Sequence, residues 1–154
     1  MEPKHQVMKI KEENKGRFVQ AMQKLVWAIK SEIEACGDLC GGLNEKEINI
    51  IDFIGQNQQV KMSDIADTIA APMSTLTNIV DKLVDKKYLS REHGGDDRRV
   101  IYVTLAEKGK TSFKAIKTKK LLVADKILSQ YNEKEQAAFI EHMNMLASSL
   151  GSKK

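Results

Sequence analysis

The chain has few of the residues on which disulfide scaffolds and metal centres depend. Its 154 residues include two cysteines, Cys36 and Cys40, which are too few for the framework of a secreted disulfide-rich domain. The three histidines, His5, His93 and His142, lie far apart in the sequence, without the paired spacing of zinc ligands. The sequence therefore predicts no metal and no cofactor, and a reducing, cytoplasmic setting.

Catalytic signatures and long apolar runs are also missing. The sequence contains no glycine-rich loop that would cradle a phosphate and no nucleophile elbow, so we expect a protein that is not an enzyme. No apolar stretch near the N-terminus resembles a signal peptide or a membrane span, which predicts no membrane partner. The polar, lysine-rich residues 1–16 are expected to form a frayed arm.

Positive charge is concentrated in one region. The formal net charge of +4 is too mild to identify a polyanionic partner by itself. Within residues 86–110, however, seven Lys and Arg residues accompany four Asp and Glu residues, an excess of three positive charges. Two runs with β-type alternation flank the glycine- and arginine-rich residues 94–99. Residues 88–109 therefore predict a β-hairpin with a basic tip.

Helical periodicity dominates the remaining sequence. Apolar side chains recur at three- and four-residue steps in residues 15–35, which predicts a long helix that ends at Gly37. Asn44 and Glu47 have the spacing of a capping box, so a second helix is expected to begin there and to end near Gly55. Two further helices are expected over residues 108–131 and 133–150, and no linker or repeat divides the chain.

A helix-turn-helix unit is predicted before the hairpin. Ser63 is expected to cap a short helix over residues 63–70, and Ala71-Pro72 ends it because proline disfavours helical geometry in the residue before it. Pro72 suits the first turn of the next helix, which runs to about Lys87. A second helix that follows a tight turn is the usual reader of such a unit.

The predicted reader helix has one apolar and one polar face. Leu76, Val80 and Leu83 share the apolar face, while Ser74 and Asn78 lie on the opposite face with the carboxylates Asp81 and Asp85. Short hydroxyl and amide side chains near a helix N-terminus can reach base edges and phosphates in a major groove. A merely solvated face is the alternative, and the two carboxylates favour it because they repel phosphate.

The hairpin beside this helix favours nucleic-acid binding. An arginine at a hairpin tip can enter the minor groove while the helix occupies the neighbouring major groove. Asp97 lies two residues before Arg99, on the same side of an extended segment, and can hold its guanidinium in a bidentate pair. The alternative is that this pair only holds the hairpin closed.

Two segments resemble a known family. Residues 97–99, Asp-Arg-Arg, then Val103-Thr104-Leu105 and Gly109, follow the order of a wing signature, and residues 74–83 leading to Leu89 and Arg91 match its reader helix. On these residues the chain resembles the MarR (multiple antibiotic resistance regulator) family. The resemblance implies a mainly α fold with a small β-hairpin wing, in which a winged helix-turn-helix lobe of about residues 44–105 is flanked by dimerisation helices of about 12–36 and 107–150.

The resemblance also implies a function and its residues. We expect a homodimeric transcriptional regulator, most often a repressor in this family, that binds a pseudo-palindromic operator of double-stranded DNA. Base contacts are assigned to Ser74, Thr77 and Asn78, and backbone contacts to Thr75, Lys82 and Arg91. Minor-groove insertion is assigned to Arg99 or Arg98, with Asp97 as the partner. A winged-helix protein-interaction module without an operator is the alternative, and a small thiol oxidoreductase is a more distant one.

Two residues depart from the family pattern. Ala106 stands where a threonine usually caps the helix after the wing, so the cap is expected to be absent unless Thr104 and Glu107 supply it from an earlier start. Tyr88 stands where a glycine commonly ends the reader helix. A positive φ at Tyr88 would be strained, so we expect an altered helix end.

Partners other than DNA are suggested by the remaining residues. Trp27, Leu121, Leu122 and Leu128 lie off the main apolar stripes of their helices, which indicates burial on more than one side and supports a homodimer. Some relatives bind small aromatic or phenolic effectors between the dimer helices and the winged lobe, and Trp27, Phe53 and Met62 are candidates to line such a site. Cys36 and Cys40 are candidate redox sensors, although small buried hydrophobes are their alternative role.

Overall fold

The computed structural model describes residues 10–94 and 100–151, without the side chains of residues 33, 34 and 36–39. The described residues form six helices and a small sheet: α1 (Glu12–Leu39), α2 (Glu45–Asn57), β1 (Gln59–Lys61), α3 (Met62–Thr68), α4 (Met73–Asp85), β2 (Leu89–His93), β3 (Ile101–Leu105), α5 (Glu107–Leu128) and α6 (Glu133–Gly151). This mainly helical winged-helix architecture confirms the predicted fold class.

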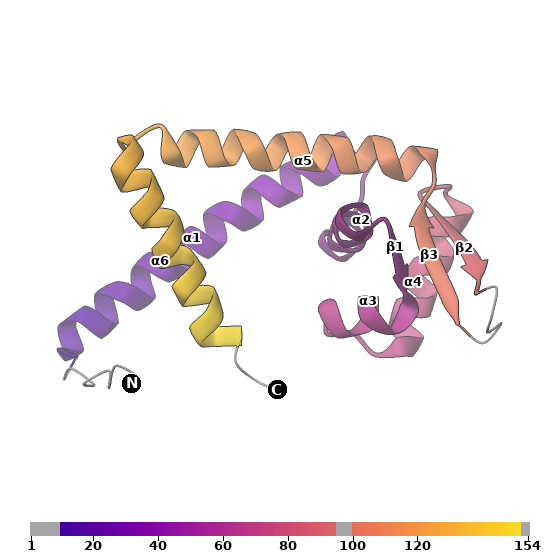
Figure 1. Cartoon of the computed structure of the whole chain (residues 1–154), viewed down its shortest axis with the longest axis horizontal. Coiled ribbons are helices and arrows are strands. Elements are labelled where there is room, and N and C mark those ends of the chain that lie inside the picture. Colours follow the sequence, from indigo (N-terminus) through magenta and orange to yellow (C-terminus); the bar gives the residue numbers. More distant parts are fainter. Residues whose placement is uncertain (1–9, 95–99, 152–154) are drawn as a thin grey trace.

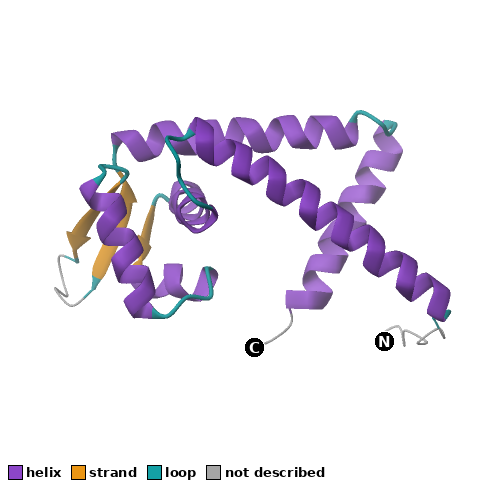
Figure 2. Cartoon of the chain, turned by 180° about the vertical axis from the view of Figure 1, so that it is seen from behind, coloured by secondary structure: helices purple, strands orange, loops and turns teal. Residues whose placement is uncertain are grey.

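The molecule consists of a compact lobe and a set of extended helices. In Figure 1, α2, α3, α4 and the sheet lie beneath one end of the long helix α5, whereas α1 and α6 extend away from the lobe. The view from behind shows the same separation (Figure 2). The buried core lies in the lobe and includes Ile50, Ile51, Ile54, Ile65, Leu76, Val80, Leu83, Tyr88 and Val103.

Two of the glycines at which helices were predicted to end lie inside those helices instead. Helix α1 continues through Gly37 to Leu39, and α2 continues through Gly55 to Asn57. A glycine costs a helix about 1 kcal/mol relative to alanine, which tertiary packing can outweigh. At Gly55 the reason is visible, because an added Cβ would lie 2.3 Å from the Phe113 ring of α5.

Helix α3 begins at Met62, one residue before the predicted range, and its N-cap residue lies two positions before Ser63. Lys61 is the N-cap residue of α3 instead of Ser63, and its backbone N–H donates to the Asp64 carboxylate at 3.4 Å. The helix ends at Thr68, after which Ala70 adopts a positive φ of 48° and the Ala71 N–H donates to the Ala66 carbonyl. This is the six-to-one bond of a Schellman motif, and it turns the chain into α4.

The sheet has one strand more than the predicted hairpin. Its order is β1-β3-β2, and both pairings are antiparallel. Strand β1 places Val60 opposite Val103 of β3, and both side chains are buried. Three residues are too few to show a periodicity in the sequence, which explains why this strand was not predicted.

Candidate nucleic-acid interface

Helix α4 presents a polar face beside the sheet. Leu76, Val80 and Leu83 are buried, and Pro72 occupies its N-cap position. Five polar side chains are exposed on the other side: Ser74, Asn78, Asp81, Lys82 and Asp85. The predicted division of this helix into two faces is therefore present in the structure.

The predicted base-contacting residues differ in accessibility. Ser74 and Asn78 are exposed, whereas Thr75 and Thr77 are half-buried. The Thr77 hydroxyl donates to the Met73 carbonyl at 2.8 Å, so its proton is used within the helix. Its oxygen keeps acceptor capacity. Ser74 and Asn78 are consequently the more available donors on this face.

Lys82, predicted as a backbone contact, pairs with a buried carboxylate. Its Nζ lies 2.7 Å from Oε1 of Glu47, whose side chain is only 2% exposed, while the Lys82 side chain is 52% exposed. Glu47 Oε2 also accepts the Asn44 N–H at 2.9 Å and completes the predicted capping box of α2. Burial raises the pKa of Glu47, but the hydrogen bonds from Lys82 and Asn44 and the charges of Lys82 and Lys86 outweigh burial and lower it.

Arg91 of β2 pairs with Asp81 of α4. The guanidinium Nη1 contacts the Asp81 Oδ1, and the Arg91 side chain is 27% exposed. The carboxylate was interpreted from the sequence as unfavourable to DNA, but in the structure it joins the reader helix to the wing. The partners of Lys82 and Arg91 were both missed at the sequence level, because they lie on separate elements.

The wing is described at its base and not at its tip. The Gly94 N–H donates to the Val100 carbonyl at 2.9 Å, which closes the described part of the hairpin. Asp97, Arg98 and Arg99 lie outside the described residues, so their predicted roles stay predictions. His93 lies at the end of β2 and is exposed.

The end of α4 resolves the departure from the family pattern at Tyr88. Lys87, not Tyr88, has the positive φ, at 62°. Tyr88 N–H donates to the Leu83 carbonyl and Lys87 N–H to the Val84 carbonyl, which together form a Schellman motif without glycine. Tyr88 is thereby free of the anticipated strain, and its buried hydroxyl donates to the Cys40 carbonyl at 2.9 Å.

The departure at Ala106 leaves the start of α5 without a side-chain cap. Ala106 is its N-cap residue, and Thr104 belongs to β3. The Ala106 N–H donates to the Tyr88 carbonyl at 3.0 Å, which ties the start of α5 to the end of the reader helix. The expected absence of the cap is therefore observed, and backbone contact fixes this junction.

An apolar cavity of about 220 Å³ lies between α1, α2 and α5. Its lining consists of Ile29, Glu32, Ile48, Asn49, Ile116, Lys119, Lys120, Val123 and Ile127. The predicted effector residues are not among them. Trp27 is 79% exposed on α1, whereas Phe53 and Met62 are partly buried against the lobe core. The structure therefore does not bring these three residues together at the cavity.

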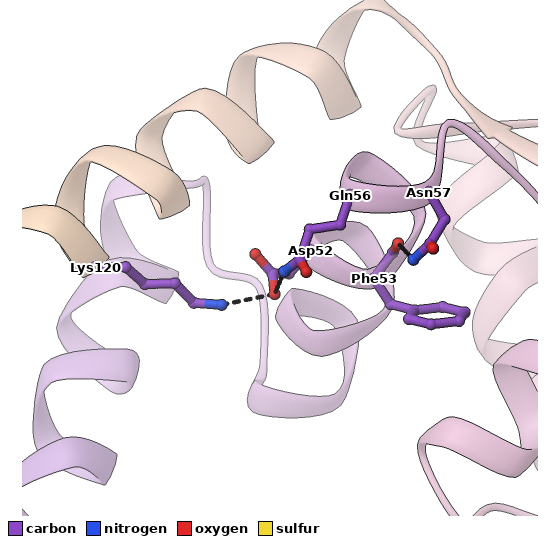
Figure 3. Close-up of polar contacts among 5 residues, drawn as sticks. All are labelled: Asp52, Phe53, Gln56, Asn57 and Lys120. Carbon is purple, nitrogen blue, oxygen red and sulfur yellow. Dashed lines mark hydrogen bonds and ion pairs between the residues drawn. The ribbon is translucent and has the colours of Figure 1, made fainter. Parts of the chain in front are cut away.

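Ion pairs surround this cavity. Glu32 of α1 lies 2.6 Å from the Lys119 Nζ and 3.3 Å from the Lys126 Nζ, both on α5. Figure 3 shows the Lys120 Nζ reaching the Asp52 carboxylate of α2, at 2.6 Å, with Gln56 on the same carboxylate. Hydrogen bonds from Lys119 and Lys126, followed by their charges, lower the pKa of Glu32. These pairs join α1 and the lobe to α5.

The structure describes the side chain of only one of the two cysteines, Cys40. Cys40 is buried, and its thiol donates a hydrogen bond to the Ser112 carbonyl at 3.8 Å. The Cys36 side chain lies outside the described residues. Burial of Cys40 favours the structural alternative for this residue, since a reactive thiol needs access.

The described residues contain neither a candidate metal site nor a candidate membrane span. No group of three or more His, Cys, Asp or Glu side chains in residues 10–94 and 100–151 is arranged to hold a metal ion. Within that same part of the chain, no helix combines the length and hydropathy needed to cross a membrane.

Comparison with known proteins places the chain among transcriptional regulators. The MarR family profile matches residues 43–101, which hold the helix-turn-helix and most of the wing. The HTH-type transcriptional regulator YfiV of Bacillus subtilis (strain 168) is 27% identical over 104 residues, covering 68% of this chain and 65% of YfiV, which is less than two thirds of its length. YpoP, another such regulator of B. subtilis, is 24% identical over 90% of this chain and 97% of its own.

Solved structures extend the similarity over the full fold. Streptococcus pneumoniae FabT, crystallised in complex with DNA, superposes with a TM-score of 0.76 at 23% identity, over 94% of this chain and all of FabT. The relatives named here are described as transcriptional regulators, which agrees with the prediction of a protein that is not an enzyme. Profile, relatives and fold agree over the winged helix-turn-helix lobe, where residues 43–101 match the MarR family of transcriptional regulators.

Proposed function

We propose that the protein is a cytoplasmic, homodimeric repressor that binds a pseudo-palindromic operator in double-stranded DNA. The observation that carries the proposal is the geometry of α4, whose apolar face is buried in the lobe while Ser74 and Asn78 are exposed beside the wing. A helix so placed can enter a major groove with its polar side chains toward base edges. A dimer that covers successive turns of duplex would exclude other proteins from that DNA. Such exclusion would repress transcription.

The proposed contacts follow the accessibility of each side chain. Ser74 and Asn78 read bases, with the Thr77 oxygen as an acceptor, and Thr75 and Lys82 contact the sugar-phosphate backbone. Arg91 contributes positive charge next to Asp81 and contacts the backbone from the base of the wing. Arg99 or Arg98 enters the minor groove, with Asp97 as the partner of the arginine.

The uncovered apolar faces of α1 and α6 support a second copy of this chain as partner. Every residue of α1 from Glu12 to Ser31 is exposed, and α6 has no buried residue among positions 133–150. The large apolar side chains left uncovered are Phe18, Val19, Met22, Leu25, Val26, Trp27 and Ile29 on α1, and Ile140, Met143, Met145, Leu146 and Leu150 on α6. Helices with this much apolar surface are stable when they are covered, and a two-fold dimer covers both at once.

Release of the operator is proposed to follow effector binding in the α1–α2–α5 cavity. The cavity is mostly apolar and has Lys119 and Lys120 among its lining residues, which suits a small aromatic or phenolic compound. The cavity contacts both the extended helices and the lobe, so a ligand that favours one lobe orientation would shift the spacing of the two wings. Oxidation at Cys36 or Cys40 is the alternative release signal.

One experiment tests the DNA-binding proposal and its rival. Fragments of random or genomic duplex are selected on the purified protein, and the enriched sequence is titrated from low to moderate salt. An operator binder should enrich a two-fold related sequence and lose orders of magnitude in affinity as about 6 to 10 phosphate contacts are screened. No enrichment, together with salt-independent binding of a protein partner, would support the protein-interaction module. Repeating the selection with aromatic ligands and with oxidant separates the two release signals.

A further inference from the structure

We propose that Glu47 is a positioning residue for DNA binding, which holds the Lys82 ammonium group where a backbone phosphate can contact it. The inference rests on the proposed DNA-binding function and adds to it a carboxylate from the core of the lobe. The capping box predicted from the sequence assigned Glu47 a role only at the start of α2.

The Glu47 carboxylate is fixed by groups on both of its sides. The side chain is 2% exposed, Oε2 accepts the Asn44 N–H at 2.9 Å, and Oε1 lies 2.7 Å from the Lys82 Nζ. A buried carboxylate is tolerated when it is paired, and the loss of its partner is costly. The ammonium group of Lys82 is therefore kept near this position.

Lys82 can contact Glu47 and a phosphate at the same time. An ammonium group has three N–H donors, and the Lys82 side chain is 52% exposed, so contact with Glu47 leaves donors accessible to solvent. Lys82 also lies on the exposed side of α4 that carries Asn78. A lysine loses rotamer freedom when a phosphate fixes it, and Glu47 imposes that loss before DNA arrives.

Replacement of Glu47 by glutamine gives opposite results under two explanations. If only net charge mattered, removing a carboxylate near DNA would tighten binding. If Glu47 positions Lys82, the neutral amide can still accept the Asn44 N–H but no longer attracts the ammonium, so binding weakens. The sign of the change therefore identifies the role.

The experiment is a double-mutant cycle on the full-length protein with its selected operator duplex. Glu47→Gln should weaken affinity about three- to tenfold, the scale of fixing one mobile side chain. Lys82→Met should weaken binding and reduce the salt slope by about one. Glu47→Gln should have no further effect in the Lys82→Met background. Glu45→Gln is the matched control, because Glu45 lies on the same helix, is half-exposed and is 3.8 Å from Lys30; it should not weaken binding.

Three results would overturn the inference while leaving the proposed function standing. The first is a Glu47→Gln protein that binds the operator as tightly as the wild type or more tightly. The second is an equal loss of affinity from Glu47→Gln in the wild-type and Lys82→Met backgrounds. The third is a Lys82→Met protein with an unchanged salt slope. The last of these applies even if Glu47→Gln does not fold, which thermal unfolding of each variant determines. A wild-type protein that binds no duplex would instead overturn the proposed function itself.

Discussion

The carbonyl oxygen of Tyr88 lies 2.0 Å from the position that a Cβ atom on Gly109 would take. That carbonyl also accepts the Ala106 N–H at 3.0 Å, so the first turn of α5 lies directly against the end of the reader helix. The close approach explains why the family signature has a glycine here, and it connects the wing and α4 to the helix that leaves the lobe.

Gly109→Ala is expected to destabilise the protein by about 1 to 3 kcal/mol, the usual cost of forcing an extra atom into a packed site. Alanine would ordinarily favour the helix, so a loss of stability isolates the clash with the Tyr88 carbonyl. Urea unfolding measures the change. Gly16→Ala in α1 is the control, since nothing lies within 4 Å of its added Cβ. Equal effects of the two substitutions would contradict the packing argument.

A second prediction concerns the non-glycine Schellman motif after α4. Lys87 has a φ of 62°, a conformation that costs a side-chain-bearing residue about 1 kcal/mol and glycine very little. Lys87→Gly should therefore raise the free energy of unfolding by about that amount.

The neighbouring residue provides the control for this prediction. Lys86 has a φ of −80°, so Lys86→Gly removes the same charge without relieving strain and should lower the stability. Thermal unfolding of both variants in one buffer checks the difference in sign. If Lys87→Gly melted no higher than Lys86→Gly, backbone strain at residue 87 would not be the cause.

The sequence predicted the lobe better than the contacts within it. The apolar face of α4 and the capping box at Asn44 depend on local spacing, and both are present in the structure. Gly55 was expected to end a helix because glycine disfavours helix interiors. The Phe113 ring that requires a small residue there is 58 positions away in the chain, so the sequence does not reveal this contact. A glycine in the sequence can indicate either a turn or a close packing contact, and the sequence alone does not distinguish the two.

The candidate site shows the same limit. Ser74 and Asn78 were predicted from helical geometry alone, and both are exposed where expected. The partner of Lys82 is on α2 and the partner of Arg91 is ten residues away on α4, so neither pair follows from local spacing. The cavity is lined by three helices that only the tertiary fold brings together. The sequence therefore could not identify its lining residues, and it suggested Trp27, Phe53 and Met62 as the effector site instead.

A third prediction follows from the lowered pKa of Glu32. A carboxylate whose folded pKa is below its ordinary value of 4.5 contributes stability above that value and loses it as the pH falls through the folded pKa. Glu32→Gln should therefore be less stable than the wild type near neutral pH, and the difference should shrink as the pH falls below 4.5 and through the lower folded pKa.

Unfolding curves measured from neutral to acid pH test this dependence. Glu107→Gln is a matched control, because Glu107 pairs with Lys110 at the exposed start of α5. Its difference from the wild type should be small across the range, as is usual for an exposed ion pair. A difference between Glu32→Gln and wild type that stayed constant from neutral to acid pH would show that the Lys119 and Lys126 contacts do not set the stability of this junction.

The last prediction concerns the proposed dimer. Leu146 on α6 is 43% exposed in the single chain, and an aspartate there would place a charge inside an interface that covers this helix. Leu146→Asp should shift the protein from dimer to monomer in analytical ultracentrifugation. It should also weaken operator binding, because two linked winged lobes gain affinity from a shared duplex that a single lobe cannot.

Asn144→Asp adds the same charge to an exposed polar position of the same helix and separates interface burial from net charge. It should remain dimeric, with an unfolding midpoint that rises with protein concentration as it does for an assembled wild type. Leu146→Asp should lose that concentration dependence, since its monomers have no association step coupled to folding. A wild-type protein that sediments as a monomer at micromolar concentration, or a Leu146→Asp protein that remains dimeric, would show that this face of α6 does not bind a second copy.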